Sequence, residues 1–491
     1  MALFSTTSLY TKAGFQVNQN IEWNMLTEDQ CEVIALTAME LVERTGVEVL
    51  SADACKALAE YGCWVDGNVV RIPSTLVEKA LLAAPSRLTL CDRNGKRAIR
   101  MEAGEVHYGP GTGNEQVIDV ASGEVRAIKK SDVEDIAKIC GELDDIDFVM
   151  DNGVPADVPA AAAEVHAFEA LVSNTVKPIV QAVKNAAQAK AVMEMAFAVK
   201  GGAEGFRRNP FAVLMVENNA TMQISAEAAD VVKAAAAEKF PVIFSNSLIT
   251  GLTAPAESAG AIVAGLANSL VMLVLAQAVS EGAPVITGGF YTIDDTDNDT
   301  HPYGAPEISM LNAGFAAVLR YLKVPSFGFG GGTDSKISDA QLGIEAAMSL
   351  LTAGLAGTNM IYGAGQMETG KIGSPYLVVM GSEIMGMTRR IMRGVEMDED
   401  RLCRGVIDDV QPGGHYLGSP HTRYYFKDEQ FWPKLMNRNR IDDWTAAGAK
   451  SLGQRTTELT QQLLSFAAPQ ALEADVAAAL KDIVAKAEAN L

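Results

Sequence analysis

The chain has few of the residues that form metal centres, disulfide frameworks or acid–base sites. Its 491 residues include only five histidines and six cysteines, and no two cysteines have the CxxC spacing of a zinc site. The cysteines are Cys31, Cys55, Cys63, Cys91, Cys140 and Cys403. Such scattered cysteines exclude a disulfide framework and are typical of a reducing, cytoplasmic environment, where we expect this protein to be.

Positive charge and long apolar runs are also scarce. The chain carries 40 Lys and Arg against 61 Asp and Glu, a formal net charge of −21, which disfavours nucleic acid and anionic membranes as partners. No run of eighteen apolar residues is present, so we predict no membrane span. We therefore expect partners among small molecules and proteins.

We do not expect the first residues to form a secretory signal peptide. Met1–Phe15 lacks the apolar core of a secretory signal peptide. The stretch resembles the translated recombination scar of some expression vectors and is equally compatible with a native sequence, so we leave it out of the fold argument.

Residues 16–130 predict an N-terminal α+β cap. Apolar residues at helical spacing indicate helices over Leu26–Glu48 and Ala52–Tyr61. Asp66-Gly67 between two apolar runs indicates a hairpin, and a further helix is expected over Pro73–Ala84. Short strands and turns fill the rest of the cap.

Residues 131–442 repeat a strand–helix pattern that predicts a TIM (β/α)8 barrel of the α/β class. Strands separated by long helical crossovers pair in parallel. The expected strands are FVMDNG from Phe148, PIVQAV from Pro178, FAVLMVEN from Phe211, PVIFSNS from Pro241, PVITGGF from Pro284, PSFGFGG from Pro325, TNMIYGAG from Thr358 and, as an eighth, GVIDDV from Gly405. An open doubly wound sheet is the alternative, but the GxGxxG that would favour it is absent. Residues 443–491 predict C-terminal helices that pack on the barrel or on a neighbouring subunit.

Function in such barrels lies at the carboxyl ends of the strands. These ends carry amides, carboxylates and aromatic rings: Asp151, Asn152, Gln181, Glu217, Asn218, Asn219, Asn246, Ser247, Tyr291, Thr333, Asp334, Tyr362 and Gln366. No lysine lies inside an apolar run as a Schiff-base enzyme requires, since Lys184 and Lys336 come later, in polar surroundings. No His, Asp and Glu cluster has metal-ligand spacing, so we expect no metal site.

The segment Phe327–Gln341, FGFGGGTDSKISDAQ, predicts a buried strand whose end delivers polar groups to a pocket. Its glycines lack a Cβ and let a large ligand come close to the backbone. Asp334 in this segment is either a site carboxylate or the cap of the following helix.

The aromatic residues and the shortage of acid–base groups favour a substrate that is already charged. The faces of Tyr and Phe attract a quaternary ammonium, each contact contributing about 0.5–2 kcal/mol. The candidates for such a cage are Tyr108, Tyr291, Phe327, Phe329 and Tyr362. Phe327 and Phe329 are equally compatible with barrel core, and Tyr108 with either a lid or an ordinary turn.

The histidines give two kinds of expectation. His166 lies in a helical stretch and is interpreted as structural. His415 and His421, in PGGHYLGSPHT, flank a glycine-rich loop and either take part in function or cap local backbone.

Three long blocks carry a resemblance to a known family. They are GGGTDSKISDAQLGIEAAMSLLTAGLAGTNMIYGAGQMETG, SEIMGMTRRIMRGVEMD and PGGHYLGSPHTRYYFKDEQFWPKL. They closely resemble the trimethylamine methyltransferase superfamily, and the resemblance runs from the helix AMELVERTGVEV to Trp444, nearly the whole chain. The founding branch has a pyrrolysine in the barrel, whereas every position here is a standard residue. The chain is therefore identified as resembling the non-pyrrolysine branch.

This resemblance implies a TIM barrel that transfers a methyl group from a methylated amine to the Co(I) corrinoid of a separate carrier protein. In the non-pyrrolysine branch the substrates are quaternary amines, and glycine betaine is favoured here, with proline betaine, carnitine and γ-butyrobetaine as alternatives. The chain has no DxHxxG corrinoid-ligating motif, so we expect cobalamin to come with the carrier and not to bind tightly to this chain. Family members also lead us to expect a homo-oligomer.

The implied chemistry needs no general acid, because a quaternary nitrogen leaves as a neutral tertiary amine. Glu217 and Asp334 would balance the ammonium charge as the catalytic carboxylates. The other expected substrate-binding residues are Tyr108, Tyr291, Phe329, Tyr362 and Gln366, with Asn152, Gln181, Asn246 or His415 as anchors for a carboxylate. The residues expected to leave room for the corrin ring are Gly330, Gly331, Gly332 and Thr333.

Two other classes of protein remain open at this point. A non-catalytic betaine-binding or sensing barrel would use the same aromatic pocket. A barrel lyase or aldolase would need a lysine, a metal or a buried acid–base pair at the strand ends.

Overall fold

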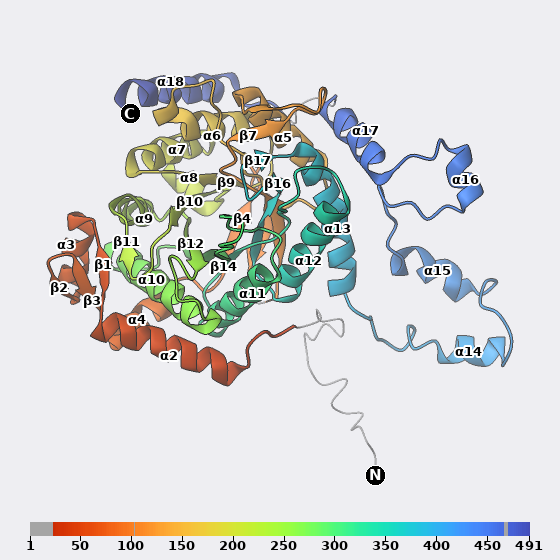
Figure 1. The fold of residues 1–491 in the computed structure, drawn as a ribbon, viewed down its shortest axis with the longest axis horizontal. Coiled ribbons are helices and arrows are strands. Elements are labelled where there is room, and N and C mark those ends of the chain that lie inside the picture. The colour runs from red at the N-terminus through yellow and green to blue at the C-terminus, as the bar shows by residue number, and fades with distance from the viewer. Residues whose placement is uncertain (1–22, 103, 466–469) are drawn as a thin grey trace, which may run out of the picture.

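A parallel sheet closed into a barrel forms the centre of the molecule in the computed structural model, which describes residues 23–102, 104–465 and 470–491. Seven strands follow one another in the order β6-β15-β14-β13-β12-β10-β9 (Figure 1). They are β6 (His107–Pro110), β9 (Ile179–Ala182), β10 (Ala212–Asn218), β12 (Val242–Thr250), β13 (Val285–Ile293), β14 (Ser326–Phe329) and β15 (Met360–Ala364). The predicted α/β barrel is thus confirmed.

The gap between β6 and β9 is closed by the short extended segment around Val149. Val149 pairs in parallel with Ile179 of β9. On its other side, the backbone N–H of Asp147 donates to the carbonyl oxygen of Tyr108 in β6 at 2.8 Å. This segment therefore occupies the eighth strand position of the barrel. It corresponds to the first strand that the sequence predicted, FVMDNG from Phe148.

The expected eighth strand at Gly405 is wrong. Arg404–Val410 forms the exposed helix α14, and the remaining barrel strand is β6, which lies inside the segment assigned to the cap. GVIDDV has an apolar spacing that also suits one turn of helix, and β6 is too short and glycine-rich to stand out. The domain boundaries at 130 and 442 stay predictions.

Helices cover the outside of the barrel between successive strands (Figure 1). They are α5 (Lys130–Glu142), α6 (Ala163–Asn174), α7 (Ala186–Val199), α9 (Ala226–Glu238), α10 (Ser258–Val279), α11 (Pro306–Tyr321), α12 (Ala340–Leu355) and α13 (Pro375–Met392), with the short η1 (Ala160–Ala162) and α8 (Ala203–Arg208) beside them. Each crossover returns the chain to the same end of the barrel, so the loops after the strands gather there.

Alternation along the strands separates two layers of core. The inward-facing side chains form a cluster of their own that includes Phe148, Met215, Ile286, Phe329 and Tyr362. The outward-facing ones belong to the larger core between the sheet and the helices. A hairpin of β4 (Leu88–Cys91) and β5 (Arg97–Met101) packs into the inner cluster and hydrogen-bonds the chain just before β9 and β10. It therefore closes the amino-terminal end of the barrel.

The N-terminal cap contains the predicted helices and hairpin. Its elements are α2 (Glu28–Arg44), β1 (Val47–Val49), α3 (Ala52–Tyr61), β2 (Trp64–Asp66), β3 (Val69–Arg71) and α4 (Ser74–Ala83). Strand β1 pairs in parallel with β11 (Gln223–Ile224) of the barrel domain. The suggested cloning scar, Met1–Phe15, lies outside the described residues.

Helix α10 is the most apolar of the described helices. It is the only described helix long and apolar enough to cross a membrane, and 83% of its most apolar window is buried inside the protein. It lies between the barrel and the cap, because it packs against β12 and β13 on one side and α2, α3 and α4 on the other. Its composition therefore reflects burial on both sides.

A small second sheet lies at the carboxyl end of the barrel, and two helices at the C-terminus pack on its outside. A second sheet joins β7 (Gln116–Ile118) and β8 (Val125–Ala127) to β16 (Gln366–Met367) and β17 (Ile372–Gly373). The C-terminal helices α17 (Leu452–Leu464) and α18 (Ala474–Asn490) pack on α13 and α5 and on α6 and α7, respectively.

Residues 393–450, which we call the arm, project from the side of the barrel (Figure 1). The arm holds α14, α15 (Pro420–Glu429) and α16 (Ile441–Ala446), and none of the residues of these three described helices is buried. It returns to the barrel once on the way, where Leu435 is buried beside α13.

Candidate functional site

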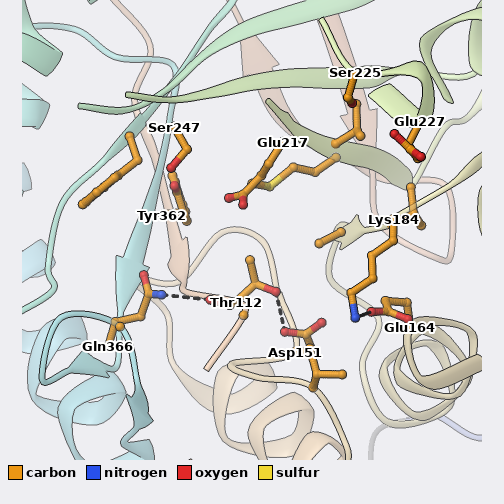
Figure 2. A pocket seen from close by; sticks show the side chains of 18 of the residues that line it. Thr112, Asp151, Glu164, Lys184, Glu217, Ser225, Glu227, Ser247, Tyr362 and Gln366 are labelled. Carbon is orange, nitrogen blue, oxygen red and sulfur yellow. Dashed lines mark hydrogen bonds and ion pairs between the residues drawn. The ribbon is translucent and has the colours of Figure 1, made fainter. Parts of the chain in front are cut away.

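A cavity of about 450 Å³ opens at the carboxyl ends of the barrel strands (Figure 2). Its lining comes from most of the strand ends: Thr112, Gly113, Asp151, Val154, Glu164, Ala182, Val183, Lys184, Met215, Val216, Glu217, Ser225, Glu227, Ser247, Phe290, Tyr303, Tyr362, Gln366 and Gly370. Cavities of this size bind small molecules and are usually the functional sites of such barrels.

Glu217 is an unpaired charge of this cavity, as is Glu227 nearer its edge (Figure 2). Glu217 follows the inward-facing Met215 on β10, and alternation turns its carboxylate into the cavity (Figure 2). Among the described residues no hydrogen bond or ion pair reaches it, although its surface is open to the cavity. Its depth in the barrel raises the pKa of the carboxyl, because surrounding protein atoms replace bulk water. An anion held this way attracts a cationic ligand.

Aromatic rings lie on the wall near Glu217. Phe290 and Tyr303 have ring centroids 4.6 Å apart, and Phe329 lies beneath them with its centroid 5.0 Å from each. Tyr362 has its centroid 5.6 Å from that of Phe329, edge to face. Burial, and then the charge of Glu217, raise the pKa of both tyrosines. The rings and the carboxylate therefore share one region of the cavity.

A second carboxylate, Asp151, is buried and hydrogen-bonded. The hydroxyl of Thr112 donates to its Oδ1 at 2.6 Å, and the backbone N–H of Gly153 donates to the same atom at 2.9 Å. Burial nevertheless raises the pKa of Asp151 to about 6. Nearby, the side-chain amide of Gln366 donates to the Thr112 carbonyl at 2.8 Å, while its Oε1 has no hydrogen-bond partner among the described residues.

Lys184 is the only basic side chain among the described lining residues. Its Nζ lies 2.6 Å from Oε1 of Glu164, whose side chain is 3% exposed, whereas that of Lys184 is 66% exposed. The other oxygen of Glu164 accepts a hydrogen bond from Gln188 at 2.8 Å. The buried carboxylate thus fixes the direction of the lysine, and the ammonium keeps further N–H groups for a ligand.

The structure brings three of the sequence-predicted site residues into the cavity: Glu217, Tyr362 and Gln366. Phe329 lies one layer below them, in contact with rings that do line it. Phe327 stacks on Tyr362 with centroids 4.4 Å apart, so both phenylalanines belong to the inner core and Phe329 also supports the cavity wall.

Three predicted residues face the helices instead of the cavity. The hydroxyl of Tyr108 lies 3.7 Å from Sδ of Met392 in α13. Asn246 donates to Oγ of Ser269 in α10 at 3.0 Å, and the ring of Tyr291 packs on Phe315 in α11. Each of these side chains lies on the outward face of its strand. The predicted substrate contacts of Tyr108, Asn246 and Tyr291 are therefore corrected.

Asn152, Gln181 and His415 also lie off the cavity wall. Asn152 is buried and its carbonyl accepts from the amide of Asn114 at 2.7 Å. Gln181 is buried and donates to the carbonyl of Ala182 at 2.9 Å. His415 is exposed in the arm. None of these three placements gives a direct anchor for a substrate carboxylate.

Asp334 and the glycines before it hold the loops of the site together. The Asp334 carboxylate accepts hydrogen bonds from the backbone N–H of Tyr303 at 2.6 Å and of Gly304 at 2.8 Å. It therefore positions the Tyr303 ring instead of capping the next helix, a role that Asp339 fills.

Residues 330–333 are buried and leave no opening for a large ligand. A Cβ on Gly332 would lie 2.4 Å from Cζ of Phe329, and one on Gly330 would lie 3.0 Å from the carbonyl oxygen of Ser349. The hydroxyl of Thr333 donates to Glu345 at 2.6 Å. The glycines Gly330, Gly331 and Gly332 thus allow close packing, which corrects their predicted role at the mouth.

His166 has the structural position that its sequence context predicted. It is buried, and its Nε2 lies 2.9 Å from Oε1 of Glu488 in α18. Of the residues that sequence reasoning missed, Phe290 and Tyr303 matter most. Phe290 could have been found from strand alternation, but Tyr303 lies in an irregular loop that carried no signal.

Comparisons with known proteins agree with this architecture. The family model described as trimethylamine methyltransferase (MTTB) matches residues 5–491. A trimethylamine methyltransferase MttB of Desulfitobacterium hafniense is 33% identical over 94% of this chain and 93% of its own. A glycine betaine methyltransferase of the same species is 29% identical over 95% of this chain and 97% of its own.

A solved structure shows the same fold at much lower sequence identity. The monomethylamine methyltransferase MtmB of Methanosarcina barkeri superimposes with a TM-score of 0.50 and 11% identity, over 93% of this chain and 91% of that one. The matched family model covers almost the whole sequence, so the resemblance read from the three blocks is confirmed. The chain belongs to the trimethylamine methyltransferase (MTTB) family and is a methyltransferase.

Proposed function

We propose that this chain transfers a methyl group from a quaternary amine of the betaine class, with glycine betaine favoured, to the Co(I) of a separate corrinoid protein. The observation that carries the proposal is the unpaired carboxylate of Glu217 beside the rings of Tyr303 and Tyr362. A quaternary ammonium donates no hydrogen bond, so a carboxylate and aromatic faces recognise it where amides and hydroxyls would not. A relative that is named glycine betaine methyltransferase supports the choice.

The distal carboxylate of a betaine needs its own partner. Asn152, Gln181, Asn246 and His415 do not line the cavity, whereas Lys184 does. We therefore assign the carboxylate end of the substrate to Lys184, which Glu164 holds in place at 2.6 Å. A zwitterion bound between Lys184 and Glu217 would present its methyl groups in a fixed direction.

The chain itself has to bind, orient and dehydrate the substrate. Orientation converts an encounter into an effectively unimolecular step, and exclusion of water strengthens the electrostatic contacts. The corrinoid supplies the nucleophile when its carrier protein docks. A cavity of about 450 Å³ accommodates a small amine and not a corrin macrocycle, which supports cobalamin remaining with the carrier at the open end. Cytoplasmic location and homo-oligomeric assembly belong to the same proposal.

The test combines the protein with a reduced corrinoid carrier and one candidate amine at a time. We expect the Co(I) absorption band to decay, and dimethylglycine to accumulate, with glycine betaine. Decay with proline betaine, carnitine or γ-butyrobetaine alone would retain the reaction and correct the substrate. Saturable binding with no methyl transfer to any carrier or to free cob(I)alamin would replace the proposal with a betaine-binding protein.

A substitution tests the assignment of Lys184. Lys184→Met should weaken the affinity for betaines about tenfold or more, since a charge-assisted contact contributes roughly 1.5–3 kcal/mol. It should leave the affinity for tetramethylammonium, which has no carboxylate, unchanged. Equal loss for both ligands would show that Lys184 only maintains the shape of the site.

A further inference from the structure

The barrel cavity carries more negative charge than a betaine neutralises. Its carboxylates are those of Asp151, Glu164, Glu217 and Glu227, whereas Lys184 is the single basic side chain among its described lining residues. Lys184 is already paired with Glu164 at 2.6 Å. A betaine brings one positive and one negative charge, so it leaves the excess of negative charge in the cavity unchanged. A ligand with a net positive charge complements this cavity better.

Glu227 is the carboxylate to which the proposed function gives no role. It lies in the first turn of α9, whose N-terminus is capped by Ser225: the hydroxyl oxygen of Ser225 accepts the backbone N–H of Ala228 at 3.1 Å. The helix therefore does not need the Glu227 side chain as its cap. That side chain is exposed at the edge of the cavity, and among the described residues no hydrogen bond or ion pair reaches its carboxylate. It is available to a cation that enters the cavity.

The charged groups divide the cavity into two ends. Figure 2 shows the Glu217 carboxylate turned towards Tyr362, whereas Glu227 and Lys184 lie on the side of the cavity away from that ring. The first end, which also includes Tyr303, holds a carboxylate among aromatic rings. We call it the aromatic end. The second, which we call the outer end, offers one ammonium and one unpaired carboxylate side by side in the lining.

The size of the cavity suits a ligand that reaches both ends. Its volume of about 450 Å³ lies within the range of roughly 300–1,000 Å³ that is typical of sites for ligands of drug size. Glycine betaine has a single carbon between its ammonium and its carboxylate, so it fills only part of such a space. A longer chain between the two charged groups would fill the rest and exclude the remaining water.

We propose that the cavity also accepts a longer substrate, a quaternary amine whose far end carries a protonated amine beside the carboxylate, that is, a trimethylammonio α-amino acid. The inference rests on the proposed function and extends it to this class. The quaternary group lies at the aromatic end against Glu217, the carboxylate binds Lys184, and the primary ammonium donates hydrogen bonds to Glu227. In the reaction the C–N bond to one methyl group breaks, its electron pair stays on nitrogen as a neutral tertiary amine, and the methyl group passes to the Co(I) of the corrinoid protein.

The first experiment compares two ligands that differ in one group. Nε-trimethyllysine carries the α-amino group, and its deaminated analogue has a hydrogen atom in that place. Titration calorimetry on the full chain, with no corrinoid protein present, measures both affinities. We expect trimethyllysine to bind about fivefold more tightly, as an ion pair at the edge of a cavity allows. The ratio should decrease as the salt concentration rises.

A substitution connects this preference to one side chain. Glu227→Gln keeps the shape of the residue and should bring the two affinities together. Glu281→Gln, at an exposed carboxylate at the opposite end of the barrel, is the matched control and should keep the ratio of the parent protein. Equal affinities in the parent protein would overturn the proposal, and so would a preference that persists in Glu227→Gln.

Methyl transfer separates this inference from the proposed function. With the reduced corrinoid protein present, we expect dimethyllysine to form from trimethyllysine. If glycine betaine is demethylated and trimethyllysine is not, the longer substrate class is wrong and the proposed function stands. If no quaternary amine is demethylated, the proposed function fails and the substrate inference fails with it, even where calorimetry shows the preference that depends on Glu227.

Discussion

The two faces of the barrel strands treat polar side chains in opposite ways. On the outer face of β12, the amide of Asn246 donates towards Ser269 at 3.0 Å, Gly265 at 3.2 Å and Gly288 at 3.4 Å. On the inner face of the neighbouring β10, the carboxylate of Glu217 has no partner among the described residues. Adjacent strands thus carry one side chain that completes the scaffold and one that is left available.

This difference separates structural from functional polarity. A buried polar group that no ligand reaches is in most cases satisfied by the protein, as the amide of Asn246 is. A polar group that faces a cavity is satisfied by water until a ligand replaces the water, so it stays unpaired in the protein alone. A polar side chain that faces inward and has no hydrogen-bond partner in the protein is therefore what marks the site.

Replacing the unpaired inner carboxylate should have the largest effect on catalysis. Glu217→Gln keeps the shape of the side chain and removes the charge opposite the substrate ammonium, so we expect kcat/KM to fall about 10²-fold. Because depth in the barrel raises the pKa of this carboxyl, loss of the charge should not lower the melting temperature. Glu281→Gln, an exposed carboxylate before β13 at the opposite end of the barrel, is the control and should behave as the parent protein does.

Replacing a satisfied outer amide should have the reverse effect. Asn246→Ala removes the buried hydrogen bonds of the amide to Ser269, Gly265 and Gly288 and leaves a small cavity, at a cost of about 2–3 kcal/mol in the free energy of unfolding. The kcat/KM per folded molecule should stay close to that of the parent, as measured well below the melting transition. A variant that is stable but inactive would place Asn246 in the site and contradict the comparison.

Most of the fold followed from the sequence, because it depends on periodicity over long segments. The helices of the cap, the hairpin at Asp66-Gly67 and the strands from Phe148 to Thr358 lie where the sequence predicted them. The barrel strand β6 was missed because His107–Pro110 is a short, glycine-containing segment whose pairing with β15 depends on residues 253 positions away, as in the pair His107 and Met360.

The residues of the site were harder to predict because they depend on which of two neighbouring residues in each strand faces the inside of the barrel. Tyr291 and Asn246 were selected in place of their neighbours Phe290 and Ser247, which line the cavity. The register of the strands decides which residue faces inward, because residues paired across parallel strands point to the same face. Phe329 pairs with Tyr362, and Gly288 of β13 pairs with Phe327 of β14. The even-numbered residues of β13 therefore point inward, as Phe327 and Phe329 do. Register was not available from a single sequence.

Removing an aromatic face from the inner wall should have an intermediate effect. Tyr362→Leu should raise the KM for a quaternary amine about tenfold, since one cation–π contact contributes about 0.5–2 kcal/mol. Tyr362→Phe keeps the ring and should retain most of the affinity, as titration calorimetry would show. Equal losses in both variants would assign the effect to the hydroxyl.

The pH should produce a smaller change through Asp151, whose pKa is raised to about 6. Below that pH the carboxyl is neutral, so affinity for a cationic ligand should fall severalfold between pH 7 and pH 5. The folded protein holds this proton more tightly than the unfolded chain, so Asp151 lowers the free energy of unfolding as the pH rises from about 4 to about 6. Asp151→Asn should flatten this part of both profiles, and an unchanged profile would assign the titration to Glu217.

The smallest effect should come from the outer tyrosine. The hydroxyl of Tyr291 is buried and has no hydrogen-bond partner among the described residues, so Tyr291→Phe removes a group that gains nothing from its position. We expect the free energy of unfolding to stay within about 1 kcal/mol of the parent value, or to rise, because an unsatisfied buried hydroxyl costs free energy. The kcat/KM should not change, since the ring faces α11 and not the cavity. A large loss of activity at constant stability would show that alternation does not divide this barrel into a scaffold face and a substrate face.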